Sequence, residues 1–194
     1  MRRFFKALIV LVLLAFLAAG GAGAYLWYVW SSNLPYIGTL EEYHPPIITE
    51  IYSADGEVIG RFWEEKRIVI PLDRVPRHLV EAFVAAEDDR FFEHKGVDFL
   101  SIFRAFIKNI QAGKIAQGGS TITQQVTRSL LLKNPKKTYR RKAREAILSL
   151  QIEKTFSKER ILFLYLNQIY LGHGAYGVEA AARTYFGKPA MELT

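Results

Sequence analysis

The fold of this chain is set by the stretch Leu79–Gly96, which reads LVEAFVAAEDDRFFEHKG. Apolar residues recur at positions 79, 80, 83 and 84, the spacing of one helix face, and Pro76 stands where a first-turn proline belongs. The next position on this apolar stripe is Glu87. A carboxylate at the end of such a stripe is expected to be partly desolvated, which suits a general base. The same pattern also fits a Glu87 that lies at the helix edge and points to water.

A second informative stretch is Gly118–Gln125, which reads GGSTITQQ. The two glycines allow a sharp turn or a close backbone approach, and Ser120 is the expected cap of a helix that runs to about Leu132. One face of that helix is apolar, and a different face carries polar groups that suit a sugar or phosphate ligand. The alternative is an ordinary capped helix with a solvated polar face. The apolar positions are Ile122, Val126 and Leu130; the polar ones are Thr121, Gln125 and Arg128.

A basic run follows this second stretch and contains no acidic residue. Such a run is usually a solvated face, but it also suits lipid headgroups or a diphosphate. Arg141 and Glu145 stand four residues apart on the next predicted helix, which is the spacing of a routine helix salt bridge. Glu145 also supplies a second carboxylate to set beside Glu87. The run consists of Arg128, Lys133, Lys136, Lys137, Arg140, Arg141, Lys142 and Arg144.

The N-terminal segment indicates a membrane protein. Three basic residues lie within positions 1–6, and no charge occurs from Ala7 to Trp30, about 24 residues, enough to span a bilayer core as a helix. Aromatic residues crowd the far end of this run, and the basic residues predict a cytoplasmic tail at 1–6. We expect residues 7–30 to be a retained transmembrane anchor. The small residues at 22–24 leave a cleaved signal peptide as the alternative.

Composition narrows the class of partner. The 194 residues carry a formal net charge of +7, which suggests an anionic partner. Because the rest of the chain is expected outside the cytoplasmic membrane, nucleic acid is not the expected one. The chain has no cysteine, so disulfides and thiolate metal sites are excluded. The length beyond the anchor suffices for one domain with a core of its own.

The remaining chain is predicted to be mainly α-helical with a small β region. Residues 31–46 are linker-like, and strands are expected at 47–52, 58–63 and 67–70, with a hairpin turn at Asp55-Gly56. We expect Asp98 to cap a helix that ends near Gly113, with its bulky apolar face in the core; contact with a membrane surface is the alternative. Further helices are expected after Thr138, after Ser157 and at 175–185. The glycines at 172, 174 and 177 follow no strand, so nucleotide binding is not indicated.

Four ordered motifs resemble one known family. They are Glu-Asp-x-x-Phe-x-x-His-x-Gly at 87–96, Gly-x-Ser-Thr-Ile-Thr-Gln-Gln at 118–125, Arg-Lys-x-x-Glu at 141–145 and Lys-x-x-Ile-Leu-x-x-Tyr-Leu-Asn at 158–167. Their order and spacing are similar to those of the peptidoglycan glycosyltransferase domain of class A penicillin-binding proteins and monofunctional transglycosylases. The resemblance covers about 47–194 and implies a lysozyme-like helical fold. The family's domain continues past residues 185–188, so the resemblance implies that 47–194 lacks the C-terminal part of that domain.

The resemblance also implies a reaction. It implies that lipid II is polymerised into β-1,4-linked glycan with inversion, and that the donor is the growing chain on undecaprenyl diphosphate. Glu87 matches the general base on the acceptor hydroxyl, and Glu145 the second catalytic carboxylate. A Mg²⁺ or Mn²⁺ ion at the diphosphate is left open as a cofactor, as are other cell wall synthesis proteins as partners. The implied substrate-binding residues are Asp88, Phe91, His94, Ser120, Thr121, Gln125, Arg128, Arg141 and Lys142.

Two rival functions remain open from the sequence. A muramidase-like hydrolase would also use paired carboxylates on a helical scaffold, but it has no diphosphate for a basic helix to neutralise. A membrane-anchored binding module would not need Glu87 and Glu145 together. The expected location is therefore the cytoplasmic (inner) membrane of a bacterium, with one transmembrane pass and the catalytic domain on the extracytoplasmic face.

Overall fold

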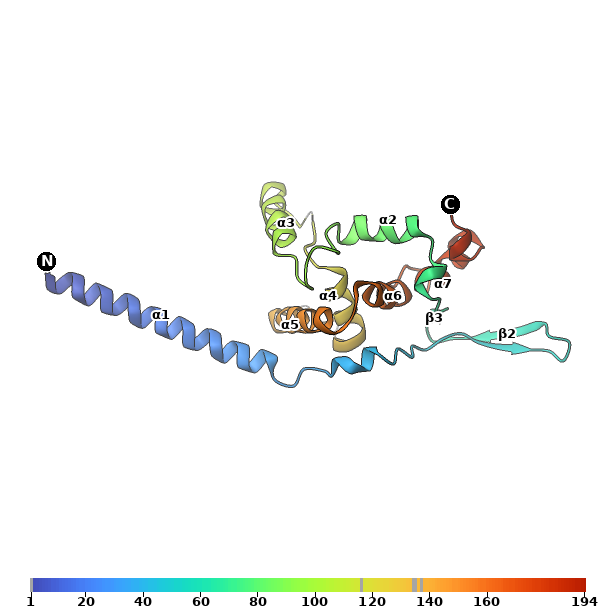
Figure 1. Cartoon of the computed structure of the whole chain (residues 1–194), viewed down its shortest axis with the longest axis horizontal. Coiled ribbons are helices and arrows are strands. Elements are labelled where there is room, and N and C mark those ends of the chain that lie inside the picture. Colours follow the sequence, from blue (N-terminus) through green and yellow to red (C-terminus); the bar gives the residue numbers. More distant parts are fainter. Residues whose placement is uncertain (1, 116, 134–135, 137) are drawn as a thin grey trace.

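The computed structural model describes residues 2–115, 117–133, 136 and 138–194. In this part of the chain helices predominate, and the strands are few and short, as the sequence predicts (Figure 1). The α-helices are α1 (Arg2–Ser31), α2 (Arg77–Glu87), α3 (Phe99–Ala112), α4 (Ile122–Val126), α5 (Tyr139–Thr155), α6 (Lys158–Gln168) and α7 (Val178–Phe186). The strands are β1 (Thr49–Tyr52), β2 (Val58–Phe62), β3 (Lys66–Arg67) and β4 (Ala175–Tyr176), and a π-helical segment occupies Thr127–Leu132.

The N-terminal apolar run forms one continuous helix. α1 is 30 residues long, and no residue in it is buried against the rest of the molecule. It is long and apolar enough to cross a membrane. Figure 1 shows it projecting from one end of the molecule, and the β1–β2 ribbon projects from the opposite end.

The segment predicted as a linker, 31–46, lies against the domain. Leu40 is buried in the main core. The guanidinium of Arg160 donates to the carbonyl oxygens of Leu40 and Glu41 at 2.7 and 2.8 Å. The hydroxyl of Tyr43 donates to the side-chain oxygen of Gln168 at 2.9 Å. These contacts hold the segment 31–46, which connects α1 to the domain, against α6.

The predicted hairpin is confirmed. β1 and β2 pair antiparallel, with Thr49 opposite Phe62, and Gly56 adopts a φ of +86° in the turn between them. The third strand, predicted at 67–70, is shorter than predicted. Only Lys66–Arg67 is extended, and this β3 pairs in parallel with β4 rather than with the hairpin. Sequence distance hid this pairing, because β4 lies more than a hundred residues further along the chain.

The core is built around α4 and α6. Ile122 and Val126 of α4 pack in one cluster with Ile161, Leu164 and Leu166 of α6, all of them buried. Val84 of α2 and Ile152 of α5 close this cluster from two sides. The amide side chain of Asn167 bridges to the backbone of Ile70, donating to its carbonyl at 3.0 Å and accepting from its N–H at 2.9 Å. This bridge ties α6 to the segment that leads into α2.

The prediction that the apolar face of α3 belongs to the core is wrong. The helix begins after Asp98 and ends at Gly113, as predicted, and the side chain of Asp98 accepts from the amides of Leu100 and Ser101. However, Ala105 is its one buried residue, and Phe99 is 73% exposed. Amphipathic spacing shows that a face is apolar, but not what covers it. The other large apolar residues that α3 exposes are Leu100, Ile102, Phe103, Phe106, Ile107 and Ile110.

Candidate active site

Glu87 ends α2 at the edge of an open cavity of about 500 Å³. The amide nitrogen of Gln125 donates to Oε2 of Glu87 at 2.8 Å and fixes the direction of the carboxylate. The expected partial desolvation of Glu87 is wrong, because its side chain is exposed at the helix end. The stripe that predicted burial stops at Val84, the one buried residue of α2. The cavity is lined by residues 85–89, Asp98, Ser101, residues 117–121, Gln125 and Arg128.

Asp88, next in sequence, is buried and holds the motif together. Its buried carboxylate accepts from Nε2 of His94 at 2.9 Å and from the backbone N–H of Ile122 at 2.9 Å. Nδ1 of His94 accepts in turn from the N–H of Gly96 at 3.1 Å. Asp88 and His94 therefore join the first motif to the start of α4. Asp88 also contributes to the wall of the Glu87 cavity, whereas His94 is not among the residues that line it.

Gly96 explains the end of the first motif. Its φ is +97°, and an added Cβ would lie 2.5 Å from the carbonyl oxygen of Ser149 on α5. Only glycine fits a left-handed backbone against another backbone at this distance. The hydroxyl of Thr121 donates to the carbonyl oxygen of Gly96 at 2.7 Å. The turn thus brings the first and second motifs and α5 together.

Phe91 and Lys158 stabilise the loop that carries the first motif. Phe91 is fully buried, and Nζ of Lys158 lies 4.3 Å from its ring centroid. The same Nζ donates to the carbonyl oxygen of His94 and to Oε1 of Glu153, both at 2.8 Å. The fourth motif therefore supports the first through a cation, a contact that the spacing of the two motifs did not predict.

The second motif starts its helix one residue later than predicted. The N-cap is Thr121, not Ser120, and Thr121 forms a capping box with Gln124. The predicted helix to Leu132 is also divided, since the α-helix ends at Val126 and a π-helical segment follows. Such segments are frequent at functional sites. Thr121, Gln125 and Arg128 do line the Glu87 cavity, together with Ser120; their contact with substrate stays a prediction.

The third motif places a buried carboxylate beneath two cations. Glu145 is 0% exposed, and Nζ of Lys142 donates to its Oε1 at 2.7 Å. Nε of Arg141 lies 3.9 Å from its Oε2, so the predicted pair of i and i+4 is present. Lys142 also donates to Oγ of Ser120 at 2.8 Å and to Oε1 of Gln124 at 3.1 Å. Any effect of Glu145 on substrate must therefore pass through the cations that it holds.

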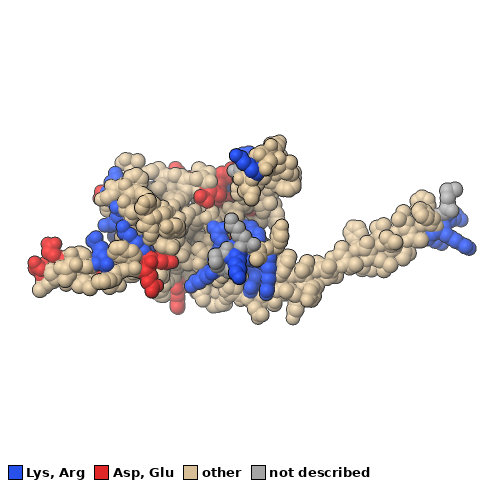
Figure 2. Space-filling model, turned by 180° about the vertical axis from the view of Figure 1, so that it is seen from behind, with Lys and Arg blue, Asp and Glu red and all other residues tan. Residues whose placement is uncertain are grey.

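Not all predicted site residues share one cavity. Arg141 lines a smaller cavity of about 140 Å³ with Leu132, Thr138, Arg140 and Arg144, and it is absent from the wall of the Glu87 cavity. Lys142 connects the two regions through Ser120. Figure 2 shows lysine and arginine side chains gathered on the body close to where α1 leaves it. Lys137, part of the predicted basic run, lies outside the described residues.

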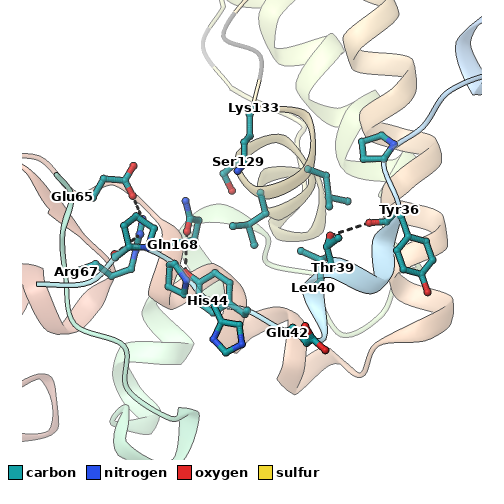
Figure 3. Close-up of a pocket in the computed structure, with 16 residues that line it drawn as sticks. Tyr36, Thr39, Leu40, Glu42, His44, Glu65, Arg67, Ser129, Lys133 and Gln168 are labelled. Carbon is teal, nitrogen blue, oxygen red and sulfur yellow. Dashed lines mark hydrogen bonds and ion pairs between the residues drawn. The ribbon is translucent and has the colours of Figure 1, made fainter. Parts of the chain in front are cut away.

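The open space continues past the Glu87 cavity. A cavity of about 320 Å³ shares Gln125 and Arg128 with it, and is also lined by Tyr165 of the fourth motif. A cavity of about 770 Å³, larger than either of these two, lies under the 35–46 segment and shares Ser129 and Gln168 with the 320 Å³ cavity (Figure 3). Size therefore does not single out the Glu87 cavity, because this larger one is not lined by Glu87.

Carboxylates other than Glu87 also line the Glu87 cavity. Asp98 lines its wall. Burial alone would raise the pKa of Asp98, but hydrogen bonds from Ser101 and Leu100 and the nearby Arg90 guanidinium hold this pKa below its usual value.

Among the residues that the structure describes, no three histidine, aspartate or glutamate side chains are grouped so as to hold a metal ion.

A comparison with family models decides the class of this chain. The model described as transglycosylase matches residues 55–194, which include all four motifs. The chain belongs to the transglycosylase family. The resemblance seen in the motifs, to the transglycosylase domain of class A penicillin-binding proteins, is thereby confirmed.

Relatives of this transglycosylase chain are penicillin-binding proteins 1A. The protein of Aquifex aeolicus (strain VF5) is 51% identical over 162 residues, 84% of this chain and 22% of the relative. That of Escherichia coli (strain K12) is 44% identical over 192 residues, 99% of this chain and 22% of the relative. This chain thus spans 22% of the length of either. The crystal structure of penicillin-binding protein 1A from Haemophilus influenzae at 2.6 Å matches 77% of this chain and 12% of that one, with 29% identity and a TM-score of 0.30.

Proposed function

We propose that this chain is a membrane-anchored peptidoglycan glycosyltransferase that polymerises lipid II into β-1,4-linked glycan strands. One observation carries the proposal: a carboxylate, Glu87, is oriented by Gln125 at the edge of a cavity that Arg128 also lines. A base and a cation facing one space are what the displacement of a diphosphate by a hydroxyl requires. Family membership supports the same reaction.

The reaction assigns a role to each group. Glu87 takes the proton from the 4-hydroxyl of the acceptor N-acetylglucosamine as its oxygen attacks the anomeric carbon of the donor. The bond from that carbon to the diphosphate oxygen breaks, and undecaprenyl diphosphate leaves with the electron pair. A direct attack on an α-linked donor inverts the configuration and gives the β-linked product. Because Glu87 is exposed in the free protein, the bound substrate itself would exclude water from the carboxylate.

The leaving diphosphate needs positive charge. Arg128 faces the cavity, and Lys142 and Arg141 are held by Glu145 just beyond Ser120. Cations fixed before the reaction stabilise charge on the leaving oxygens without reorganising. Glu145 acts in this proposal as a positioning residue for Lys142 and Arg141, a narrower role than that of a second reacting carboxylate.

A divalent cation is compatible with this site in one way. Since the described residues offer no group of three carboxylate or histidine ligands, a Mg²⁺ or Mn²⁺ ion would take most of its ligands from the diphosphate itself. Such an ion would supply further positive charge to the leaving group. Polymerisation measured with and without EDTA distinguishes a dependent from an independent enzyme.

The membrane side of the molecule is proposed from three features. α1 carries no charged residue from Ala7 to Trp30, α3 exposes an apolar face, and basic side chains gather close to the base of α1 (Figure 2). We propose that α1 crosses the cytoplasmic membrane and that the domain lies outside it. We also propose that the domain has a lysozyme-like fold. Carbonate washing should leave the protein in the membrane fraction; a mature N-terminus near Tyr25, found by sequencing, would show a cleaved signal instead.

The function is tested by incubating the protein with labelled lipid II and separating the products. We expect polymer from the wild type, and a loss of several orders of magnitude from a folded Glu87→Gln variant, because an amide cannot accept the proton. Hydrolysed product would instead support a muramidase-like enzyme. That reading is weaker in the structure, because Glu145 is fully buried and cannot flank a glycosidic bond opposite Glu87. Binding of lipid II with no product at all would indicate a binding module.

A further inference from the structure

The hydroxyl of Tyr165 is a buried polar group that the proposed mechanism does not use. Tyr165 lies on α6 and is 2% exposed, and its ring packs edge to face against Phe83 of α2. Its hydroxyl has no hydrogen-bond partner among the described residues. Leaving a buried hydroxyl unpaired costs folding free energy, and a phenylalanine of the same shape would avoid that cost. A group kept at such a cost calls for a partner that is absent from the protein itself.

The surroundings of this hydroxyl show where that partner would lie. Tyr165 lines the cavity of about 320 Å³ that shares Gln125 and Arg128 with the Glu87 cavity. The side chains of Gln125 and Arg128 are therefore part of the wall of both spaces. Burial raises the pKa of Tyr165, and the charge of Glu87 raises it further while that of Arg128 lowers it, so both charged groups act on this hydroxyl. The phenol is thus neutral and able to donate.

The rest of the cavity wall suits one class of ligand. The rings of Tyr170 and Tyr176 lie 5.0 Å apart, and Gln168 and Ser129 add an amide and a hydroxyl. Oε1 of Gln168 already accepts from Tyr43, which leaves its amide nitrogen for a ligand. A pyranose ring presents apolar C–H faces and a rim of hydroxyl and acetamido groups, so aromatic rings beside amide and hydroxyl donors match it.

We propose that the Tyr165 hydroxyl is a substrate-contacting group, which donates a hydrogen bond to a hydroxyl or acetamido oxygen of a sugar lying across Gln125 and Arg128. This inference rests on the proposed function, because it takes the ligand to be the glycan of that reaction. It adds a contact next to the Glu87 cavity: the sugar that reaches Tyr165 would also lie against Gln125, the side chain that orients Glu87. The competing reading is that Tyr165 only fills the core and that its hydroxyl is idle.

Tyr165→Phe separates these readings, because it removes the hydroxyl alone. If the hydroxyl only fills space, the variant should be as stable as the wild type or more stable, with unchanged kinetics. The proposal predicts the same unchanged or raised Tm together with a fall in kcat/KM for lipid II of roughly tenfold. Tyr52→Phe is the matched control, since it removes a tyrosine hydroxyl on the exposed β1–β2 ribbon and should leave kcat/KM unchanged.

A binding measurement separates this inference from the proposed function. The full chain in detergent, with its tyrosine rings ¹³C-labelled, is titrated with a peptidoglycan tetrasaccharide that lacks the diphosphate. Wild-type binding that is weakened in Tyr165→Phe supports the contact even if the chain makes no polymer, in which case only the proposed function fails. Polymerisation and binding that are both identical in Tyr165→Phe and the wild type would overturn the contact and leave the function intact. A wild type that neither polymerises lipid II nor binds the tetrasaccharide would overturn both.

Discussion

Adjacent residues in the first motif perform opposite tasks. Glu87 is exposed and accepts a hydrogen bond from Gln125, whereas Asp88 is buried and accepts from both His94 and the start of α4. The division follows from the helix end. Glu87 is the last residue of α2, and Asp88 leaves the helical conformation with φ −160° and ψ 72°, which turns its side chain inward. One residue of sequence thus separates the proposed base from a structural carboxylate.

This division predicts different losses from the two alanine variants. Asp88→Ala should lower the free energy of unfolding by on the order of 2–4 kcal/mol, because two buried donors lose their acceptor. Glu87→Ala should change the free energy of unfolding by no more than about 0.5 kcal/mol, since the side chain removed is exposed. It should nevertheless abolish polymerisation, because the proposed base is lost. Thermal unfolding followed by circular dichroism, run beside the lipid II assay, measures both. A strongly destabilised Glu87→Ala protein would contradict this division.

Arg141 gives a second prediction at this scale. A partly buried pair with Glu145 at 3.9 Å would contribute little to the rate if it were only structural, whereas a guanidinium near the leaving diphosphate acts in the transition state. We expect Arg141→Ala to slow polymerisation by roughly thirty- to a thousandfold, about 2–4 kcal/mol of barrier, and Arg141→Lys to recover part of it. Steady-state rates with unfolding curves alongside are the measurement. A wild-type rate in Arg141→Ala would remove this residue from the site.

At the scale of elements, local sequence signals predicted well where helices begin, but predicted poorly which elements pack or pair with one another. Asp98, Thr138 and Ser157 were each expected to begin a helix, and each accepts an amide hydrogen bond as an N-cap. Capping is decided within four residues, so the sequence contains it. The parallel pairing of β3 with β4 depends on chain segments that meet only in the folded domain. The contacts of Lys158 with His94 and Phe91 in the first motif also form only in the folded domain, so the two motifs could be recognised in the sequence but their contact could not.

The exposure of the apolar face of α3 leaves membrane contact as our prediction for this helix. Because the chain has no cysteine, a spin label can be attached to a single introduced one. We expect a label at Phe103→Cys to be accessible to apolar oxygen and shielded from a water-soluble nickel complex in lipid vesicles, because the lipid core excludes the charged reagent. The matched control is Lys108→Cys on the same helix, which should show the opposite preference. Equal accessibility of the two labels to both reagents would contradict membrane contact.

At the scale of the whole molecule, the domain is tied to its anchor by specific contacts. The guanidinium of Arg144 on α5 donates to the carbonyl oxygens of Ser32 and Asn33, just past the end of α1. These carbonyls belong to the turn that ends the helix, where a cation also meets the negative end of the helix dipole. α1 and α3 extend on the same side of the body in Figure 1. A fixed angle between α1 and α5 would therefore set how α3 and the Glu87 cavity meet the membrane.

We expect Arg144→Ala to separate attachment from orientation. The variant keeps α1 and should stay in the membrane fraction, since the apolar span is unchanged. It loses the contacts that hold the turn after α1, so the domain should sample more orientations. Polymerisation of lipid II embedded in vesicles should then fall several-fold, while activity in detergent micelles, where no bilayer plane must be met, should change little. Lys154→Ala is the control, because Lys154 is exposed near the other end of α5 and should leave both activities unchanged. An equal loss in vesicles and in micelles would mean that Arg144 acts on the site itself rather than on how the domain is held above the membrane.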